Sequence, residues 1–432
     1  MTMKQFVSSP TFKWIIFLFG LGLSFWMFTT FQLHYDQEQI LGKVHKLLTT
    51  GEWTHYGNRS TGLGYNPGTL LTLLAGAPMA LWYSPYSAMG LIVFTQALAC
   101  AFFYFPLSRV FGNLSATFFL LLFWLSPWRI EQVELYNPSY LFIFSGLHFY
   151  SAFKLSKKKS FFWSAVHVLN MGLCAQVHFS VLILGVTSLV LWAFKMVRVH
   201  WWGVISGLLL TLLSLLPYFL SLAAQQSETM AVDSSSGFFP GKNLIYIYPV
   251  IKAALYWLRY GSFYFARHIF TTVHFAWIDN ESLRTIVDLS FHILKWPIGI
   301  ATLFISGLFQ WKFLKMILEM KPFRREPDRK QLSEKNWMLH YGFYLFIGML
   351  ISAALSPVEF NHWHLILCLP FSALLVSIGL GKYIEQKNKW HWSLVAILVY
   401  FCIYNSFAVM GSKMHNLGNS YHDQVIERFP VE

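Results

Sequence analysis

The stretch Phe31–Trp53, FQLHYDQEQILGKVHKLLTTGEW, follows directly on the first long apolar run of the chain and decides how it can fold. Five apolar residues recur in it at helical spacing: Ile40, Leu41, Val44, Leu47 and Leu48. Gly51 follows as a stop signal, so the pattern predicts an amphipathic helix over 36–50. Asp36 and Glu38 stand at its start, where the helix dipole stabilises a carboxylate. The pattern leaves open whether Asp36 only caps the helix or has a chemical role.

The composition is typical of a membrane protein. Of the 432 residues, 56% are hydrophobic and 12% are charged, against roughly a quarter charged in a typical soluble domain. Runs of about 18 apolar residues recur, each long enough to span a membrane. We therefore predict an all-α polytopic bundle of about eleven transmembrane helices with juxtamembrane helices on the outer face. The predicted crossings are 14–33, 87–106, 112–127, 138–153, 161–176, 178–195, 201–222, 291–311, 337–355, 364–381 and 390–410.

The charge distribution predicts the orientation. The net charge of +13 comes from lysine and arginine that gather in short loops. The chief basic loops are 154–159, 195–198, 312–335 and 382–389. All of them lie on one side if the predicted crossings hold, and the positive-inside rule makes that side cytoplasmic. The N-terminus is then cytoplasmic, the C-terminus lies outside, and the charge requires no nucleic acid partner.

The crossings divide the chain into three parts. These are a transmembrane module over 1–222 with its first outer loop at 34–86, an outer loop over 223–290, and C-terminal helices with a short outer tail over 291–432. Within the first loop, 68–83 is apolar but short and contains Pro78, which predicts a half-inserted or juxtamembrane helix. Aromatic and basic residues interleave over 244–278, a pattern typical of interfacial helices. A hidden pair of spans in that loop is the alternative.

Two further stretches bring polar residues to the same face. WRIEQVELYNPS at 128–139 and AQVHFSV at 175–181 each stand at the end of a predicted crossing. They contribute Arg129, Glu131, Glu134, Asn137, Gln176, His178 and Ser180. Polar residues beside apolar runs are costly unless they are paired or line a cavity. His178 therefore has two interpretations, as a satisfied core histidine or as part of a site.

The order of these motifs resembles that of the C-type (GT-C) integral-membrane glycosyltransferases. The motifs that carry the resemblance are the Asp36 helix ending in LLTTGEW, YNPGTLLTLL, LYNPSYLFIFSGLHFYSAF, GLCAQVHFSVLIL and NHWHLILCLPFSALLVSIGLGK. They are similar to glycosyltransferase family 39, the dolichyl-phosphate-mannose–protein mannosyltransferases, and to bacterial aminoarabinose transferases. The resemblance covers most of 10–210 and 337–382. Many relatives have adjacent Asp-Glu where this chain has Asp36-Gln37-Glu38, so the role of Glu38 stays open.

The resemblance implies a function and a site. A sugar would pass from a polyprenyl-phosphate donor to a lipid, glycan or protein acceptor at the outer face, with inversion and with Asp36 as general base. It implies catalytic roles for Asp36, Glu38 and Glu131. The leaving lipid phosphate needs cationic or hydrogen-bonding partners near the headgroup plane, and the candidates are Arg129, His178, Arg59, Arg259 and Arg267. Arg129 and His178 come first, because the family-like segments contain them. The implied sugar or acceptor contacts are Gln176, Asn137, Tyr65 and Asn66. The bacterial character of the motifs predicts an inner membrane with a periplasmic active site.

Several alternatives remain beside this interpretation. No cofactor is required by the sequence, although a divalent ion held by Asp36, Glu131, His362 or His364 is a weak possibility. The aromatic residues Trp53, Tyr65, Trp128 and Tyr136 either stack on sugars or form the interfacial belt. The closest alternative function is a lipid-linked polysaccharide polymerase or ligase with its catalytic loop in 223–290. A transporter or flippase predicts internal repeats and midplane charges, which the sequence does not show apart from His148.

Overall fold

The computed structural model describes residues 3–29, 31–60, 64–223, 247–262, 274–275, 277–323, 332–356, 361–386, 391–410 and 420–430. The elements are α1 (Met3–Val7), α2 (Pro10–Phe28), α3 (Tyr35–Thr50), β1 (Tyr56–Ser60), β2 (Gly64–Pro67), α4 (Leu70–Leu81), α5 (Pro85–Phe119), the π-helix η1 (Leu120–Trp124), α6 (Pro127–Glu131), the 3-10 helix η2 (Asn137–Tyr140), α7 (Leu141–Lys157), α8 (Phe161–Val177), α9 (Val181–Ala193), α10 (Trp201–Ala223), α12 (Ile247–Tyr260), α14 (Glu281–Glu319), α15 (Glu334–Ala354), the 3-10 helix η4 (His362–Cys368), α16 (Leu369–Glu385), α17 (His391–Met410) and α18 (Tyr421–Arg428).

The chain is an integral membrane protein built from apolar helices. Six helical segments of the described chain are long and apolar enough to cross a membrane: Pro10–Phe28, Pro85–Trp124, Trp201–Ala223, Glu281–Glu319, Glu334–Ala354 and His362–Glu385. Shorter apolar helices lie between them, including α8 and α9. The helical polytopic fold is therefore confirmed, while the count of about eleven crossings stays a prediction.

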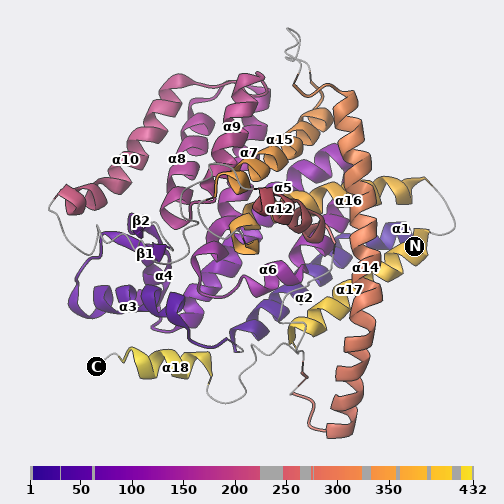
Figure 1. Cartoon of the computed structure of the whole chain (residues 1–432), viewed down its shortest axis with the longest axis horizontal. Helices are drawn as coiled ribbons and strands as arrows, with labels where there is room; N and C mark the ends of the chain where they lie inside the picture. The colour runs from indigo at the N-terminus through magenta and orange to yellow at the C-terminus, as the bar shows by residue number, and fades with distance from the viewer. Residues whose placement is uncertain are drawn as a thin grey trace.

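The core of the bundle lies between α5, α7 and α16, with α10 and α14 at opposite edges (Figure 1). In the most apolar 18-residue stretch of His362–Glu385, which ends with α16, 89% is buried inside the protein, whereas the corresponding share in α10 is 11%. Side chains that stay exposed on an apolar helix face lipid in a membrane protein. Gly112 interrupts α5 with a φ of 86°, so its two parts match the two crossings predicted at 87–106 and 112–127.

The helix predicted over 36–50 is present as α3. Its apolar side is buried at Ile40, Leu41 and Val44, and Gly51 ends it in the left-handed region with a φ of 71°. α4 packs against α3 and has 12 residues. At 1.5 Å per residue it is about 18 Å long, short of the roughly 30 Å hydrocarbon core. That length agrees with a juxtamembrane helix.

Three parts of the structure differ from the sequence prediction. The first outer loop contains a β-hairpin, β1 paired antiparallel with β2, which the hydrophobic pattern did not indicate. α14 begins ten residues before the crossing predicted at 291–311, so the outer loop ends earlier than residue 290. The C-terminal tail is not a plain tail, because α18 returns to the start of α3, where the Leu33 amide donates to Gln424 Oε1 at 3.0 Å.

Candidate functional site

Asp36 lies in the first turn of α3, and it does not cap the helix. The N-cap position is His34, and no side-chain cap hydrogen bond forms there. The Asp36 carboxyl is half-buried. Burial raises its pKa above the ordinary value, His34 opposes that shift, and the charge of Glu134 adds to it. A carboxylate whose pKa is raised toward neutrality is a better proton acceptor than an ordinary aspartate.

Glu134 ties the start of α3 to the segment that follows α6. Its Oε1 contacts His34 Nε2 and accepts a hydrogen bond from Gln37 Nε2 at 2.8 Å. Although burial lowers the pKa of His34, the hydrogen bond and charge of Glu134, with Asp36 and Glu38, raise it overall. We call His34, Asp36, Gln37 and Glu134 the carboxylate cluster. Its members come from two segments that the sequence had predicted to share one face.

The hairpin packs on the exposed side of α3 and brings amides to Asp36. Asn58 Nδ2 donates to the Asp36 backbone oxygen at 3.2 Å, and Gln39 Oε1 accepts from the Arg59 amide at 2.9 Å. Asn58, Asn66 and Gln37 are buried, and the amide oxygen of each has no hydrogen-bond partner within the described residues. Buried polar atoms of this kind call for a ligand or water. They can accept bonds from hydroxyl or amine groups.

Val177 is the point where three predicted ligand-binding stretches meet. Its carbonyl accepts from Asn66 Nδ2 at 3.3 Å and from Asn137 Nδ2 at 3.2 Å. The neighbouring Gln176 donates to Ser214 Oγ at 2.7 Å and lies against Gly68, where a Cβ would approach Gln176 Oε1 to 2.3 Å. The structure thus brings Asn66, Asn137 and Gln176 together, chiefly through bonds that hold the loops in place.

A second group of residues gathers between α6, α12 and η4. The Arg259 guanidinium lies 5.1 Å from the Trp128 ring and 4.8 Å from the Tyr256 ring. Trp128 is 5.3 Å from the His362 ring, and the charges of Glu131 and Arg259 both reach the Tyr260 hydroxyl. We call Trp128, Glu131, Tyr256, Arg259 and His362 the arginine cluster. Aromatic faces stabilise a guanidinium, and the planar edge of a guanidinium has the geometry that anions such as phosphate require.

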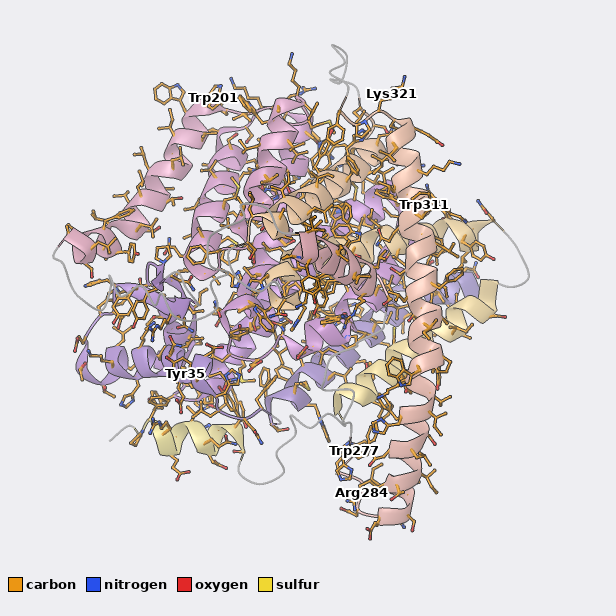
Figure 2. The ribbon with its side chains drawn as sticks, in the orientation of Figure 1. Tyr35, Trp201, Trp277, Arg284, Trp311 and Lys321 are labelled. Atoms are coloured by element: carbon orange, nitrogen blue, oxygen red, sulfur yellow. The ribbon has the colours of Figure 1, made fainter. Side chains whose placement is uncertain are left out.

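One short segment joins the two clusters. Trp128 and Glu131 belong to the arginine cluster, and Glu134 belongs to the carboxylate cluster. All three lie within seven consecutive residues that the structure buries. Tyr35, beside Asp36, lies at the same end of the molecule as Arg284 and opposite Trp201 and Lys321 (Figure 2). The carboxylate cluster at the start of α3 therefore lies toward that end of the bundle.

Arg129 does not have the position expected of a phosphate ligand. It is fully buried, and its five N–H groups all have acceptors. Nε and Nη2 donate to the Trp124 carbonyl at 2.9 and 2.6 Å, and Nη2 also donates to Gly20 O at 3.3 Å. Nη1 donates to Ser24 Oγ at 2.5 Å and Gln96 Oε1 at 3.4 Å. The predicted phosphate role is corrected: Arg129 holds α2, α5 and η1 together.

The other predicted residues are dispersed. His178 Nδ1 accepts from the Ser180 backbone amide at 3.1 Å and lies 2.7 Å from Ser180 Oγ, and its ring is 5.5 Å from that of His364. Glu38 faces Arg428 of α18 at 3.7 Å. Arg59 and Trp53 are exposed, and Tyr65 packs 4.5 Å from Tyr56. Tyr136 is half-buried. Arg267 lies outside the described residues.

Within the part of the chain that the structure describes, no three His, Cys, Asp or Glu side chains are grouped so as to hold a metal ion. Asp36, Glu131, His362 and His364 are distributed over the two clusters and η4. His364 Nδ1 accepts from the Asn361 amide at 3.0 Å. The arrangement of these four residues therefore does not by itself form a cation site, and the question of a divalent ion stays a prediction.

Two solved structures share this architecture. The crystal structure of ArnT from Cupriavidus metallidurans bound to undecaprenyl phosphate matches with a TM-score of 0.54 and 10% sequence identity, over 97% of this chain and 79% of that chain. The apo state of the same protein matches with a TM-score of 0.54 and 11% identity, over 98% and 76%. The chain has the GT-C fold. No family model and no curated protein matches the sequence.

The GT-C resemblance read from the outer motifs is thus confirmed at the level of the fold, while function rests on the site. Within this GT-C fold, several site residues escaped the sequence analysis. His34 and Glu134 are 100 positions apart, and nothing local predicted their contact. Asn58 and Gln37 gave no signal, because single amides are common. Tyr256 lies one helical turn before Tyr260 and three residues before Arg259, a spacing that could have indicated a shared face.

Proposed function

We propose that this chain is a glycosyltransferase that moves a sugar from a polyprenyl-phosphate donor to a hydroxyl or amine acceptor at the outer face of the membrane. The observation that carries the proposal is the place of Asp36. It is half-buried at the N-terminus of a juxtamembrane helix, beside buried amide oxygens. A lipid-linked sugar has its tail in the bilayer and its head at the interface, which is where the proposal requires this carboxylate to lie. The likeness to ArnT bound to undecaprenyl phosphate supports the same donor class.

The proposed chemistry is a single displacement. The acceptor oxygen or nitrogen forms a bond to the anomeric carbon while the bond from that carbon to the phosphate oxygen breaks. Asp36 takes the acceptor proton, and the electron pair leaves with the polyprenyl phosphate. The product is inverted, because one attack occurs from the opposite face. A positioned general base contributes roughly 10²–10⁴-fold.

The leaving phosphate needs a cation at the interface, and Arg259 is the best-placed described arginine. Its guanidinium lies against the Trp128 and Tyr256 rings, and Glu131 is in the same cluster. A guanidinium binds phosphate through paired N–H donors and stabilises the charge that develops on it. Glu131 would then orient Arg259, and Glu38, which faces Arg428, would hold α18 in place. The catalytic work falls to Asp36 and Arg259.

The sugar itself would contact the amides of the hairpin and α3. The acceptor oxygens of Asn58, Asn66 and Gln37 match the hydroxyl donors of a sugar. Tyr65 lies at the same hairpin and presents a ring face close to Tyr56. Arg259 belongs to the 223–290 loop, so a polysaccharide polymerase or ligase that uses this loop is the second candidate function.

Mass spectrometry of cell-envelope glycolipids and glycoproteins tests the proposal. Deleting the gene should remove one glycosylated product, and the wild-type chain should restore it. Asp36→Asn should not restore it, although it is expected to fold. Asp279→Asn, a matched change at an exposed acid of the outer side, should restore it fully. Restoration by Asp36→Asn would exclude the base assignment, and an envelope unchanged by deletion would exclude the transferase.

A further inference from the structure

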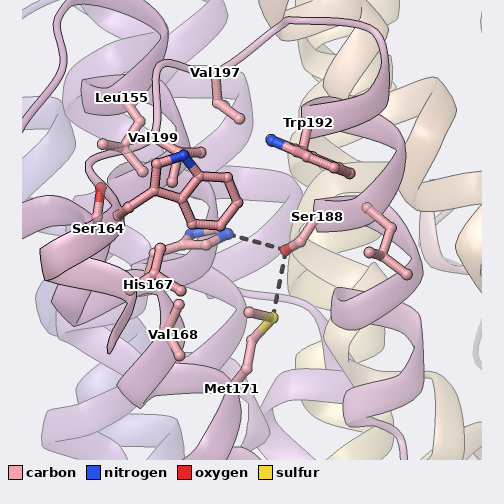
Figure 3. A pocket seen from close by; sticks show the side chains of 12 residues that line it. Leu155, Ser164, His167, Val168, Met171, Ser188, Trp192, Val197 and Val199 are labelled. Carbon is pink, nitrogen blue, oxygen red and sulfur yellow. Dashed lines mark hydrogen bonds between the residues drawn. The ribbon is translucent and has the colours of Figure 1, made fainter. Parts of the chain in front are cut away.

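A pocket lies between α8, α9 and α10, at the end of the molecule away from Asp36. Its volume is about 250 Å³. Its walls are apolar and include Leu155, Val168, Val197, Val199 and Val204. Two indoles stand at its edge, because Trp192 and Trp201 line it and their rings are 6.2 Å apart. Figure 3 shows the pocket with His167, Ser188 and Met171 at its floor. The proposed transferase chemistry makes no use of it.

The polar floor of this pocket is already satisfied from within. Ser188 Oγ bonds to His167 Nε2 at 2.9 Å and to His148 Nε2 at 2.7 Å, and it donates to Met171 Sδ at 3.4 Å. His167 Nδ1 bonds to Ser151 Oγ at 2.8 Å. A buried group that has its partners does not call for a polar ligand. The pocket therefore suits an apolar occupant along its whole depth.

Exposed cations lie on the loops that flank the pocket. Residues 135–227 contain no aspartate or glutamate. Arg198 stands between the lining residues Val197 and Val199, and its amide donates to the Leu155 carbonyl at 2.9 Å. Lys195 is exposed three residues after Trp192. The exposed Lys158 and Lys159 connect α7 to α8 at the same end. An anion held here would meet several cations and no acid from this stretch.

We propose that this pocket binds one acyl chain of an anionic phospholipid, whose phosphate is held by Lys195 and Arg198. An apolar slot beside loops that carry exposed cations matches a lipid that has an apolar chain and a negative headgroup. Tryptophans at the edge are suited to the boundary between chain and headgroup. The site takes its lipid from the leaflet on the basic side, so it is distinct from the donor site and does not depend on the proposed function.

Native mass spectrometry of the full-length protein tests the site. The probes are palmitoyl-oleoyl phosphatidylglycerol and the phosphatidylcholine with the same chains. One phosphatidylglycerol should bind tightly and phosphatidylcholine weakly. The double variant Lys195→Gln/Arg198→Gln should weaken phosphatidylglycerol about 30-fold, since each interfacial cation contributes about fivefold. Lys312→Gln/Lys315→Gln removes the same charge from exposed positions of α14 and should leave the affinity unchanged.

A second variant separates the chain from the headgroup. Val204→Phe fills the pocket without changing charge, and it should also abolish the tight phosphatidylglycerol adduct. Glycerol phosphate, which has the headgroup anion without chains, should not compete. If Lys195→Gln/Arg198→Gln and Lys312→Gln/Lys315→Gln lost the same affinity for phosphatidylglycerol, the lipid would be attracted to the basic side in general. That result would overturn the proposal. A dimer mass in place of the lipid adduct would assign the pocket to a second copy and would overturn it too.

Discussion

The carboxylate cluster at α3 and a hydrogen-bonded row of Tyr341, His148, Ser188 and His167 inside the bundle, which we call the histidine chain, both place polar groups beside apolar helices. The two groups differ in how their hydrogen bonds are satisfied. In the chain, Tyr341 Oη bonds to His148 Nδ1 at 2.7 Å, and the bonds continue through Ser188 to His167. Both ring nitrogens of His148 and of His167 are hydrogen-bonded, so the histidine chain is satisfied from within the protein. At α3, the oxygens of Asn58, Asn66 and Gln37 have no partner within the described residues.

The difference shows how a membrane protein separates structure from chemistry. A buried polar group without a partner costs about 1–3 kcal/mol, so the bundle interior contains groups that satisfy one another. The carboxylate cluster and the neighbouring hairpin tolerate that cost, because a ligand or water can provide the missing hydrogen bonds there. Arg129 is a second closed case, because its donors are all used within the protein, whereas Arg259 packs against the Trp128 and Tyr256 rings. We expect substitutions in the carboxylate and arginine clusters to change the rate of transfer. Substitutions in the histidine chain or at Arg129 should instead change stability.

The largest effect is expected at Arg259. Arg259→Ala should lower the turnover number by about 10²–10³, the usual cost of removing one donor to a developing negative charge. The thermal midpoint should change little. Transfer assays on purified protein in proteoliposomes, beside melting curves, measure both quantities. Arg284→Ala, which removes an arginine whose Nη1 donates to the Ile278 carbonyl at 3.5 Å, is the control. Wild-type turnover by Arg259→Ala would remove its phosphate role.

His148 provides the opposite case. His148→Phe keeps a planar aromatic ring but leaves the buried Tyr341 hydroxyl without its bond, which should cost about 1–3 kcal/mol of stability. Turnover below the melting transition should stay close to wild type. Detergent-solubilised melting curves and transfer rates at low temperature check the two expectations. His292→Phe on the lipid-facing helix α14 should change neither. A rate loss without a stability loss would give the histidine chain a chemical role.

Substitution of Glu134 tests what holds the carboxylate cluster in position. Glu134→Gln keeps an oxygen for Gln37 but loses the charge that pairs with His34, and charge-assisted bonds are roughly twice as strong as neutral ones. We expect about a tenfold lower turnover number with an unchanged KM for the donor, because misplacing the base affects the chemical step. Steady-state kinetics separates the two parameters. A changed KM for the donor with an unchanged turnover number would instead assign Glu134 to donor binding.

The smallest effect is expected at Lys43, which faces the hairpin from α3. Burial lowers its pKa to about 7, although the Gly57 carbonyl and the Tyr56 ring face its ammonium. In the unfolded chain the pKa is ordinary, so between pH 7 and about 10 the unfolded state binds more protons and stability rises with pH. Melting points measured from pH 7 to 9.5 should rise in the wild type and rise less in Lys43→Met. Parallel slopes would mean that Lys43 is not buried.

Much of the fold was predictable because it depends on local pattern. Apolar runs set the helices, and the spacing of Ile40, Leu41 and Val44 with Gly51 set α3 within a residue of its observed bounds. The hairpin was not predictable, since YGNRS and GYNP are short and polar. α18 carried a signal that was overlooked: Ser420 stands three residues before Asp423 and caps the helix.

The site was predictable only in part because its contacts join distant segments. The sequence predicted Asp36, Glu131 and Glu134 on one face, and in the structure Glu134 contacts His34 and Gln37 on either side of Asp36. It could not distinguish Arg129 from Arg259, because the acceptors that bury Arg129 come from Gly20, Ser24 and Gln96, far away in sequence. Burial and partner choice are properties of the packed bundle, so residue type and motif order indicate where chemistry happens more reliably than which residue performs it.

Orientation is the point on which the proposed function depends most directly. Tyr35 is 64% exposed beside Asp36, and the four native cysteines are buried, so a cysteine introduced at position 35 can be labelled selectively. In intact cells with a permeabilised outer envelope, a membrane-impermeant thiol reagent should label Tyr35→Cys at once. Lys321→Cys, at the opposite end of the molecule (Figure 2), should be labelled only after the membrane is opened. Labelling of Lys321→Cys from outside, with Tyr35→Cys protected, would place Asp36 on the cytoplasmic side and contradict the proposed transferase.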